Sequence, residues 1–263
     1  MDLKALNTQV NALCRSVGAY ISIEQGKLSS RDIATKGLHD YVTHVDRQSE
    51  KMLIDGLSGL LPGSGFLVEE NTVKNTQEEY TWIIDPLDGT TNFIHGLPVF
   101  AISVALLKGD EMILGTILDV KSDECFYASQ DGAAFLNSKE IKVSERATLG
   151  DSLLATGFPF NDFGRQKEYL QMLGHLMQQC RGIRRYGSAA IDLAWVACGR
   201  FDGFWEYGLK PWDVAAGSFI VERAGGRCSD FIGGKDFIYG KEIVCGNPGI
   251  YKELVEIVQQ DFE

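Results

Sequence analysis

The segment Trp82–Phe93, with the sequence WIIDPLDGTTNF, is the most informative part of this chain. It begins as an apolar, strand-like run and then presents two carboxylates, Asp85 and Asp88, on either side of a Pro-Leu pair. Pro86 fixes its own φ angle and biases Asp85 toward extended geometry, so we expect the strand to stop at Asp85. Close carboxylates repel at neutral pH, and a hard divalent cation relieves that repulsion. The segment therefore predicts a metal site at a strand end.

The residues after the second carboxylate predict an anion-binding turn. Gly89 permits a tight turn, and we expect Thr90 to cap a short helix. Backbone N–H groups at the start of a helix point outward and can receive a phosphate group. Oxygen ligands for Mg²⁺ beside such a turn indicate metal-assisted phosphoryl chemistry, although Asp-Pro-x-Asp-Gly is also an ordinary turn sequence.

Length and charge narrow the class of protein. The 263 residues, of which 44% are hydrophobic, can form one large domain or two smaller ones that share an interface. The net charge of −11, from 36 acidic and 25 basic side chains, argues against a protein that binds nucleic-acid polymers or anionic membranes through bulk charge. It does not argue against an anionic substrate, because bound metal ions can reverse the sign of a local site.

Cysteine usage and hydropathy indicate a cytoplasmic protein. The cysteines are scattered and include no C-x-x-C pair, so we expect reduced, mostly buried thiols. They are Cys14, Cys125, Cys180, Cys198, Cys228 and Cys245. The histidines show no zinc-ligand spacing. Residues 1–17 mix charged and apolar positions at helical spacing, which is unlike a signal peptide, and no apolar run is long enough to predict a membrane span.

Hydrophobic periodicity predicts a meander in the first half of the chain. Helices are expected over residues 3–23 and 46–61, with a polar loop over residues 26–39. Strands are expected at 66–68, 80–84, 99–107, 112–120 and 124–128. Because the last three strands follow one another through tight turns, we expect an antiparallel sheet.

From Leu153 onward, strands and helices alternate. Helices are expected at 162–179, 189–198 and 213–224, and strands near 182–185, 203–205 and 243–245. Short strands between helices indicate a mixed sheet covered by helices. We therefore predict an α/β (α+β) fold with an antiparallel first sheet, a second mixed sheet covered by helices, and subdomains at residues 1–145 and 146–263.

Further acidic residues stand at similar element ends. Asp46 lies at the predicted start of the second helix, Glu69-Glu70 follows a short strand, and Asp213 follows Pro211-Trp212 at another predicted helix start. Each has a structural explanation of its own, either as a helix cap or as a solvated pair. Their spacing does not show that they meet.

On these motifs the chain resembles the inositol monophosphatases, in the superfamily of Mg²⁺-dependent, lithium-sensitive phosphatases. Residues 82–93 match the first signature of that family. Residues 212–217, followed by Ala224-Gly225-Gly226, match the second. Gly187-Ser188-Ala189-Ala190 and Glu206 fall into register between them, so that the resemblance covers nearly the whole chain.

The resemblance implies a layered α-β-α-β-α sandwich and a site for two or three Mg²⁺ ions. Glu69, Asp85 and the backbone carbonyl of Leu87 would hold the first ion. Asp85, Asp88 and Asp213 would hold the second, so that Asp85 bridges the two. Glu69 would also reach a third ion through water, and Glu70 is an alternative to Glu69 as a ligand.

The resemblance also implies roles in catalysis. Thr90, bonded to Asp46, would orient the attacking water together with Glu69. The N–H groups of Gly89 and Thr90 would hold the phosphate. Residues that would face the substrate alcohol are Asp88, Gly187, Ser188, Ala189 and Glu206. Lys36 would lie on a basic loop that closes over the metals.

The expected activity is Mg²⁺-dependent hydrolysis of a small phosphorylated polyol or sugar by an activated water, with myo-inositol 1-phosphate as the leading substrate and a homodimer as the expected assembly. Fructose 1,6-bisphosphate, histidinol phosphate and phosphoadenosine phosphate are alternative substrates. Candidate residues for a second phosphate site are Arg165, Arg184, Arg185 and Lys210. A regulatory, protein-binding family member is a further alternative, although such proteins usually lose a metal ligand.

Overall fold

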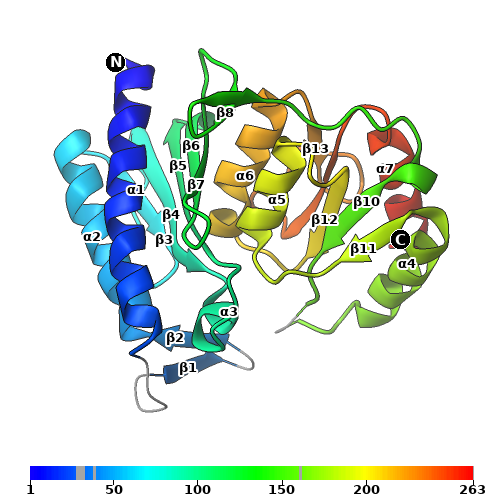
Figure 1. The fold of residues 1–263 in the computed structure, drawn as a ribbon, viewed down its shortest axis with the longest axis horizontal. Helices are drawn as coiled ribbons and strands as arrows, with labels where there is room; N and C mark the ends of the chain where they lie inside the picture. The colour runs from blue at the N-terminus through cyan, green and yellow to red at the C-terminus, as the bar shows by residue number, and fades with distance from the viewer. Residues whose placement is uncertain (28–32, 38–39, 160–161, 263) are drawn as a thin grey trace.

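The computed structural model describes residues 1–27, 33–37, 40–159 and 162–262. There, helices and sheets stack in the predicted order α-β-α-β-α (Figure 1). The outer helices on one side are α1 (Leu3–Gln25) and α2 (His44–Leu60), the central helices are α5 (Ala189–Ala197) and α6 (Pro211–Arg223), and the outer helices on the other side are α4 (Gln166–Gln179) and α7 (Tyr251–Asp261). The short helix α3 (Thr90–Ile94) and a 3-10 turn (Leu149–Asp151) lie in connections.

The first sheet has seven strands in the order β3-β4-β5-β6-β7-β8-β9. Their bounds are β3 Gly65–Val68, β4 Tyr80–Asp88, β5 Ala101–Lys108, β6 Glu111–Asp119, β7 Glu124–Ser129, β8 Ala134–Leu136 and β9 Lys139–Ile141. The predicted meander β5-β6-β7 is confirmed. The predicted antiparallel sheet is confirmed from β4 to β9, whereas its β3–β4 edge is parallel. Because β3 and β4 run in the same direction, the segment 69–79 carries the chain back along the length of β3 before β4 begins.

Strand β4 does not stop at Asp85, as the sequence predicted, but continues through Pro86 to Asp88. Asp85 pairs with Ser103 of β5 and Asp88 pairs with Ala101, so β4 carries one extra residue between the two pairs. This β-bulge accommodates the proline, which has no N–H to donate to the ladder. Residues three apart on a regular strand point to opposite faces. The extra residue therefore changes the facing of Asp88 relative to Asp85.

The second sheet is mixed, as predicted, with the strand order β11-β10-β12-β14-β13. Its strands are β10 Leu153–Thr156, β11 Gly182–Arg184, β12 Gly203–Tyr207, β13 Arg227–Ser229 and β14 Glu242–Gly246. β10 is parallel to β11 and β12, whereas β14 is antiparallel to β12 and β13. Helix α7 was not predicted, and helix α4 begins later than the predicted residue 162.

Residues 33–37 form a strand, which corrects the prediction of a loop over residues 26–39 for that part; residues 28–32 and 38–39 of the predicted loop lie outside the described residues. Strand β1 (Ile33–Gly37) pairs with β2 (Asp40–Thr43) in an antiparallel ladder. The segment is polar and shows no clear alternation, so its strand character depends on the backbone pairing. Lys36 therefore lies on a strand, and its side chain is outside the part of the chain that the structure describes.

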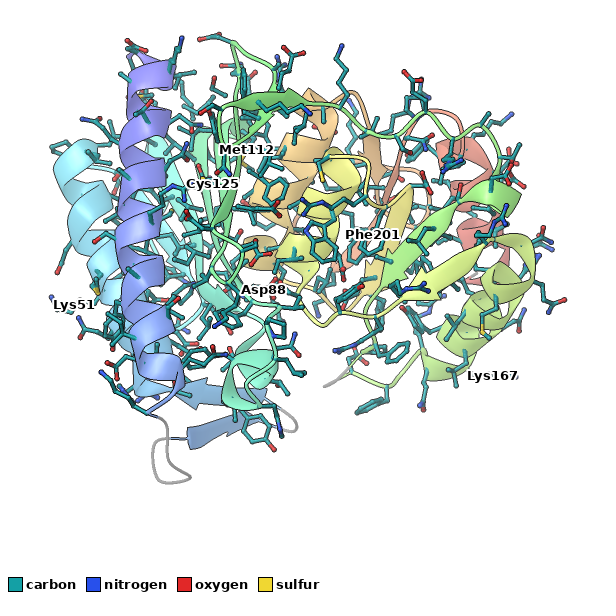
Figure 2. All side chains as sticks on the ribbon, viewed as in Figure 1. Lys51, Asp88, Met112, Cys125, Lys167 and Phe201 are labelled. Carbon is teal, nitrogen blue, oxygen red and sulfur yellow. The ribbon has the colours of Figure 1, made fainter. Side chains whose placement is uncertain are left out.

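Three buried clusters fill the spaces between layers. The central cluster joins α5 and α6 to both sheets, which explains why both helices are apolar around most of their circumference. Figure 2 shows Asp88 in the middle of the molecule, whereas Lys51 and Lys167 project from its outer sides. The proposed boundary between residues 145 and 146 falls in the connection after β9, and the division into two subdomains stays a prediction.

All six cysteines are free thiols, as the sequence predicted. Cys14, Cys125 and Cys245 are buried, and the others are partly buried. Among the helices that the structure describes, none combines the length and the apolar character that crossing a bilayer requires.

The contact between α5 and α6 gives a test of the central layer. A Cβ at Gly217 would lie 2.6 Å from the Cβ of Leu193, whereas a Cβ at Gly174 of α4 would meet nothing within 4 Å. We expect Gly217→Ala to lower the free energy of unfolding by about 1–3 kcal/mol, because the two helices must separate. Gly174→Ala, the matched control, should raise it by up to about 1 kcal/mol through helix propensity. Urea unfolding of both variants measures this, and equal effects would contradict the tight contact.

Candidate active site

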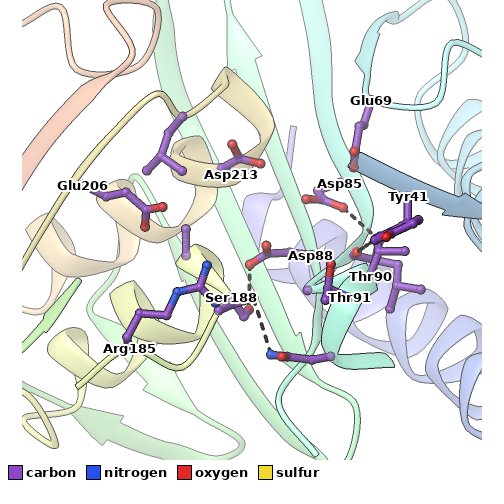
Figure 3. Close-up of a pocket in the computed structure, with 16 residues that line it drawn as sticks. Tyr41, Glu69, Asp85, Asp88, Thr90, Thr91, Arg185, Ser188, Glu206 and Asp213 are labelled. Carbon is purple, nitrogen blue, oxygen red and sulfur yellow. Dashed lines mark hydrogen bonds between the residues drawn. The ribbon is translucent and has the colours of Figure 1, made fainter. Parts of the chain in front are cut away.

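A cavity of about 360 Å³ opens between the two halves of the molecule. It is lined by residues from β4, α3, the segment before α5, β12 and the start of α6 (Figure 3). The lining residues are Tyr41, Glu69, Asp85, Leu87, Asp88, Gly89, Thr90, Thr91, Asn92, Arg185, Gly187, Ser188, Ala189, Glu206, Leu209 and Asp213. The predicted site residues are thus largely brought together by the fold.

Three carboxylates converge in this cavity. Asp85 and Asp88 come from the bulged end of β4, and Asp213 comes from the first turn of α6. One oxygen of each lies within 4.8 Å of the others. Asp85 is buried, while Asp88 and Asp213 are half-buried. Residues more than a hundred positions apart in the sequence therefore form one oxygen-lined pocket.

Hydrogen bonds fix each carboxylate. The Ser188 hydroxyl and the Ala190 N–H donate to Asp88 Oδ2 over 2.6 and 2.7 Å, at the start of α5. The Lys210 N–H donates to Asp213 Oδ2 over 2.7 Å, at the start of α6. The positive ends of both helix dipoles thus face the carboxylates.

Ser103 connects the two halves beside the carboxylate cluster. The Ser103 hydroxyl of β5 donates to the backbone carbonyl of Trp212 over 3.1 Å. Ser103 is also the cross-strand partner of Asp85, and Trp212 directly precedes Asp213. This contact therefore fixes the start of α6 relative to the end of β4.

Burial and mutual repulsion disfavour the ionised forms of these acids. Burial, followed by the charges of Glu69 and Asp88, raises the pKa of Asp85 well above its usual range. Burial, followed by the charge of Asp88, does the same to the pKa of Asp213. Burial raises the pKa of Asp88 to about 6, and the hydrogen bond from Ser188 opposes that rise. In the absence of a cation, these three carboxyl groups therefore hold protons at a higher pH than an exposed Asp does.

The donor set suits Mg²⁺. It consists only of carboxylate oxygens, the ligand type that hard cations prefer, and their raised pKa values reflect negative charge that a cation would compensate. Glu69 and Leu87 line the same cavity and remain predicted ligands. Glu70 is not among the lining residues, which favours Glu69 over this alternative.

Thr90 makes the hydrogen bond that the resemblance implied. Its hydroxyl lies 3.0 Å from Asp46 Oδ1 and 3.0 Å from the carbonyl oxygen of Leu87. Asp46 is buried and is also held by the N–H and hydroxyl of Thr43 in a capping box at the start of α2. The hydroxyl orientation of Thr90 is therefore constrained from two sides. Asp46 itself is not among the lining residues.

The turn after Asp88 differs in one detail from its prediction. Gly89, rather than Thr90, is the N-cap of α3, with φ +92° in the left-handed region. A Cβ there would lie 2.9 Å from the carbonyl oxygen of Val99, so conformation and space both require glycine. Thr90 is thereby the first residue of the helix, and its side chain is available to Asp46.

Glu50 holds the segment that carries Glu69, a role that the sequence did not reveal. Its buried carboxylate accepts hydrogen bonds from the N–H groups of Glu70 and Thr72, over 2.7 and 2.9 Å, and from the Thr72 hydroxyl over 2.7 Å. Only the folded structure brings α2 against this turn.

The opposite side of the cavity holds Glu206 and Arg185 (Figure 3). Burial raises the pKa of Glu206 to about 8, although the positive charge of Arg185 opposes the rise.

The Asn92 side-chain amide donates to the carbonyl oxygens of Val99 and Tyr186, over 2.7 and 2.8 Å, and so ties α3 to the segment before α5.

Several lining residues received no role from the sequence. They are Tyr41, Thr91, Asn92 and Leu209. Thr91 and Asn92 belong to the segment Trp82–Phe93. The amide side chain of Asn92, placed after a turn, was the only feature of the sequence that could have indicated its place in the cavity. Of the four candidates for a second phosphate site, Arg185 alone lines the cavity.

Comparison with known proteins identifies a matching family and similar relatives. The chain matches the family model described as "Inositol monophosphatase family" over residues 2–262. It is 42% identical over 256 residues to the inositol-1-monophosphatase of Rhizobium meliloti, with 97% of this chain and 96% of that protein covered. It is also 42% identical over 259 residues to the Nus factor SuhB of Pseudomonas aeruginosa, with 97% and 95% covered.

A solved structure of a relative has the same fold along the whole chain. The extragenic suppressor protein suhB from Bartonella henselae superimposes with a TM-score of 0.92 at 37% identity, with 99% of each chain covered.

The raised pKa values predict how pH affects the metal-free protein. Because Asp88 has a pKa of about 6, the folded protein binds more protons than the unfolded chain above about pH 4, where an unfolded Asp titrates. The free energy of unfolding in EDTA should therefore fall as the pH rises from about 4 through about 6, and further as Asp85 and Asp213 ionise. Mg²⁺ should reverse the loss.

Asp213→Asn should reduce this pH dependence, because it removes one of the repelling charges, and should make the metal-free protein more stable than the wild type at alkaline pH. Asp55→Asn, on the exposed side of α2, is the control and should leave the slope unchanged. Denaturant unfolding across the pH range measures both. An unchanged slope in Asp213→Asn would contradict the repulsion.

Proposed function

This chain belongs to the inositol monophosphatase family, and on that premise we propose that it is a Mg²⁺-dependent phosphatase that hydrolyses a small phosphate monoester, with myo-inositol 1-phosphate as the leading substrate. The observation that supports the proposal is the convergence of Asp85, Asp88 and Asp213 in one partly buried cluster. Concentrating like charges in this way is unfavourable in the absence of a cation. Such a cluster beside an anion-binding turn suits chemistry on a phosphate.

In this proposal, Glu69, Asp85, Leu87, Asp88 and Asp213 hold two or three Mg²⁺ ions. When bound, the ions supply charge neutralisation for the phosphate and lower the pKa of the attacking water. The protein's own contribution is mainly the positioning of groups, as in other phosphoryl transfers. The hydrogen bonds at the starts of α5 and α6 hold two of these carboxylates before any ligand arrives.

Thr90, Asp46 and Glu69 orient the water in this proposal. The Asp46 carboxylate and the Leu87 carbonyl both attract the Thr90 hydroxyl hydrogen, so the lone pairs of that oxygen remain available to a water molecule. Glu69 lines the same cavity and would accept a proton from that water. Glu50 supports Glu69 through the backbone of the following residues.

The substrate would span the cavity from Gly89 and Thr90 to Glu206. The N–H groups of Gly89 and Thr90 would hold phosphate oxygens, while Asp88, Gly187, Ser188, Ala189 and Glu206 would face the alcohol. Because the pKa of Glu206 is about 8, its carboxyl is mostly protonated at neutral pH. It can then donate one hydrogen bond to a hydroxyl group and accept another.

Other substrates of the same chemical type are the nearest alternatives. Fructose 1,6-bisphosphate, histidinol phosphate and phosphoadenosine phosphate would use the same metal cluster. The sequence Thr90-Thr91-Asn92 favours an inositol phosphatase over the members of the superfamily that act on nucleotides, in which Lys commonly replaces the second Thr.

A second candidate function is protein-binding regulation, alone or beside catalysis. It is favoured by the match to a relative named Nus factor SuhB, at the same identity as the match to a named phosphatase. All the predicted metal ligands are present in this chain, which favours catalysis. A homodimeric assembly, lithium sensitivity and a cytoplasmic location remain predictions.

Phosphate release from the four esters, with and without Mg²⁺ and at matched concentrations, tests the proposal. We expect Mg²⁺-dependent release with inositol 1-phosphate preferred. Preference for another ester would keep the metal mechanism but change the substrate. Absence of release from every ester would favour the regulatory alternative.

Asp213→Asn should lower kcat by more than about a hundredfold at ordinary Mg²⁺ concentrations, because it removes a charge from the cluster while keeping the size of the side chain. Asp151→Asn, on an exposed turn and paired with Arg181, is the matched control and should retain activity. Near-normal activity of Asp213→Asn would overturn the assigned ligand set.

A further inference from the structure

Arg185 is the only basic residue among the described residues that line the cavity. It follows β11 and precedes Ser188, the N-cap of α5. Figure 3 shows its guanidinium group and Glu206 on the side of the cavity opposite Glu69 and Thr90, with Asp88 between them. Arg185 therefore lies at the end of the cavity away from the water-orienting residues.

An aromatic contact positions Arg185. Its guanidinium carbon lies 5.7 Å from the ring centre of Phe158, within the range of a cation–π interaction. Phe158 in turn packs edge-on against the ring of Tyr169, at a centroid distance of 6.5 Å. The buried Tyr169 hydroxyl bonds to Thr156 and to the carbonyl oxygen of Gly157. The segment that supports Arg185 is thus anchored to the core of the second half.

The same segment makes room for Glu206. A Cβ at Gly157 would overlap the Glu206 carboxyl group, so only glycine is compatible with the observed position of that side chain. The Thr156 hydroxyl also donates to the carbonyl oxygen of Trp205, over 2.7 Å, directly before Glu206. Residues 156–158 therefore position both polar groups at this end of the cavity.

Although both groups line the cavity, Arg185 forms no ion pair with Glu206 or with any other carboxylate in the described part of the chain. The guanidinium hydrogen-bond donors are therefore left for a ligand. Arg184, the preceding residue, is different: its guanidinium donates to the backbone of Ile183 and does not line the cavity.

We propose that Arg185 is a specificity-determining residue, which selects a neutral polyol by donating hydrogen bonds to substrate hydroxyl oxygens opposite Glu206. This inference rests on the proposed phosphatase function and identifies a residue that recognises the alcohol part of the substrate. A hydroxyl group both accepts and donates, so it matches a guanidinium on one side and a carboxyl group on the other.

A second phosphate is the competing ligand at this end of the cavity. The carboxyl groups of Asp88, Asp192 and Glu206 lie close enough to influence one another electrostatically. A second phosphate group would bring about two negative charges to an end of the cavity that holds one guanidinium group, and it would repel the ionised form of each of these acids. An uncharged hydroxyl group meets no such repulsion, and the local charge therefore favours a polyol over a bisphosphate.

The test compares Arg185→Gln with Arg184→Gln on three substrates with Mg²⁺ present. They are inositol 1-phosphate, fructose 1,6-bisphosphate and 4-nitrophenyl phosphate, whose aryl group offers no hydroxyls. We expect Arg185→Gln to lower kcat/KM for inositol 1-phosphate by about tenfold to a hundredfold, mainly through KM, because a charge-assisted hydrogen bond is lost. The loss for 4-nitrophenyl phosphate should be much smaller, and Arg184→Gln should match the wild type throughout.

Two further variants separate positioning from folding. Arg185→Lys keeps the charge but loses the planar fork, and should recover only part of the preference for inositol 1-phosphate. Phe158→Leu removes the aromatic support and should lose part of the same preference, with an unchanged melting temperature as the check on folding.

The other outcomes overturn the proposal in distinguishable ways. Equal losses on all three substrates would place Arg185 at the phosphate end, and a loss confined to fructose 1,6-bisphosphate would assign it to a second phosphate. A retained preference in Arg185→Gln, with an active wild type, would overturn this inference alone. A wild type without Mg²⁺-dependent release from any ester would overturn the proposed function and this inference with it.

Discussion

The repulsion among Asp85, Asp88 and Asp213 is the constraint on which the site depends. Isolated carboxylates do not gather in a partly buried cavity unless the fold holds them there, and their raised pKa values reflect this cost. The bulge in β4 and the starts of α5 and α6 are the elements that hold them. The same free-energy cost that disfavours the empty cluster favours cation binding.

Rigid elements, rather than flexible loops, supply these groups. A strand end and two helix starts meet from both halves of the molecule, and Ser103 links them through the carbonyl of Trp212. The central helices α5 and α6 pack against both sheets, so their first turns are fixed relative to β4. Such preorganisation limits the rearrangement that catalysis would require.

The two halves of the molecule supply different groups to the cavity. The first half supplies Glu69 and Thr90, and Asp46 and Glu50 hold them in place. The second half supplies Glu206 and Arg185, which are both positioned by residues 156–158. On the proposed function, changes at the second end would alter the choice of alcohol while the predicted metal ligands stay in place.

The sequence by itself determined the layered fold class, the meander, the free thiols and most residues that line the cavity, because periodicity and two long signatures are local features. It did not determine the parallel β3–β4 edge, the β1–β2 hairpin or the continuation of β4 through Pro86. Those depend on backbone pairing with strands distant in the chain. The support of Glu69 by Glu50 and the position of Arg185 against Phe158 were likewise decided only by tertiary structure. Contacts between residues far apart leave no periodic signal, and they form only when packing brings the elements together.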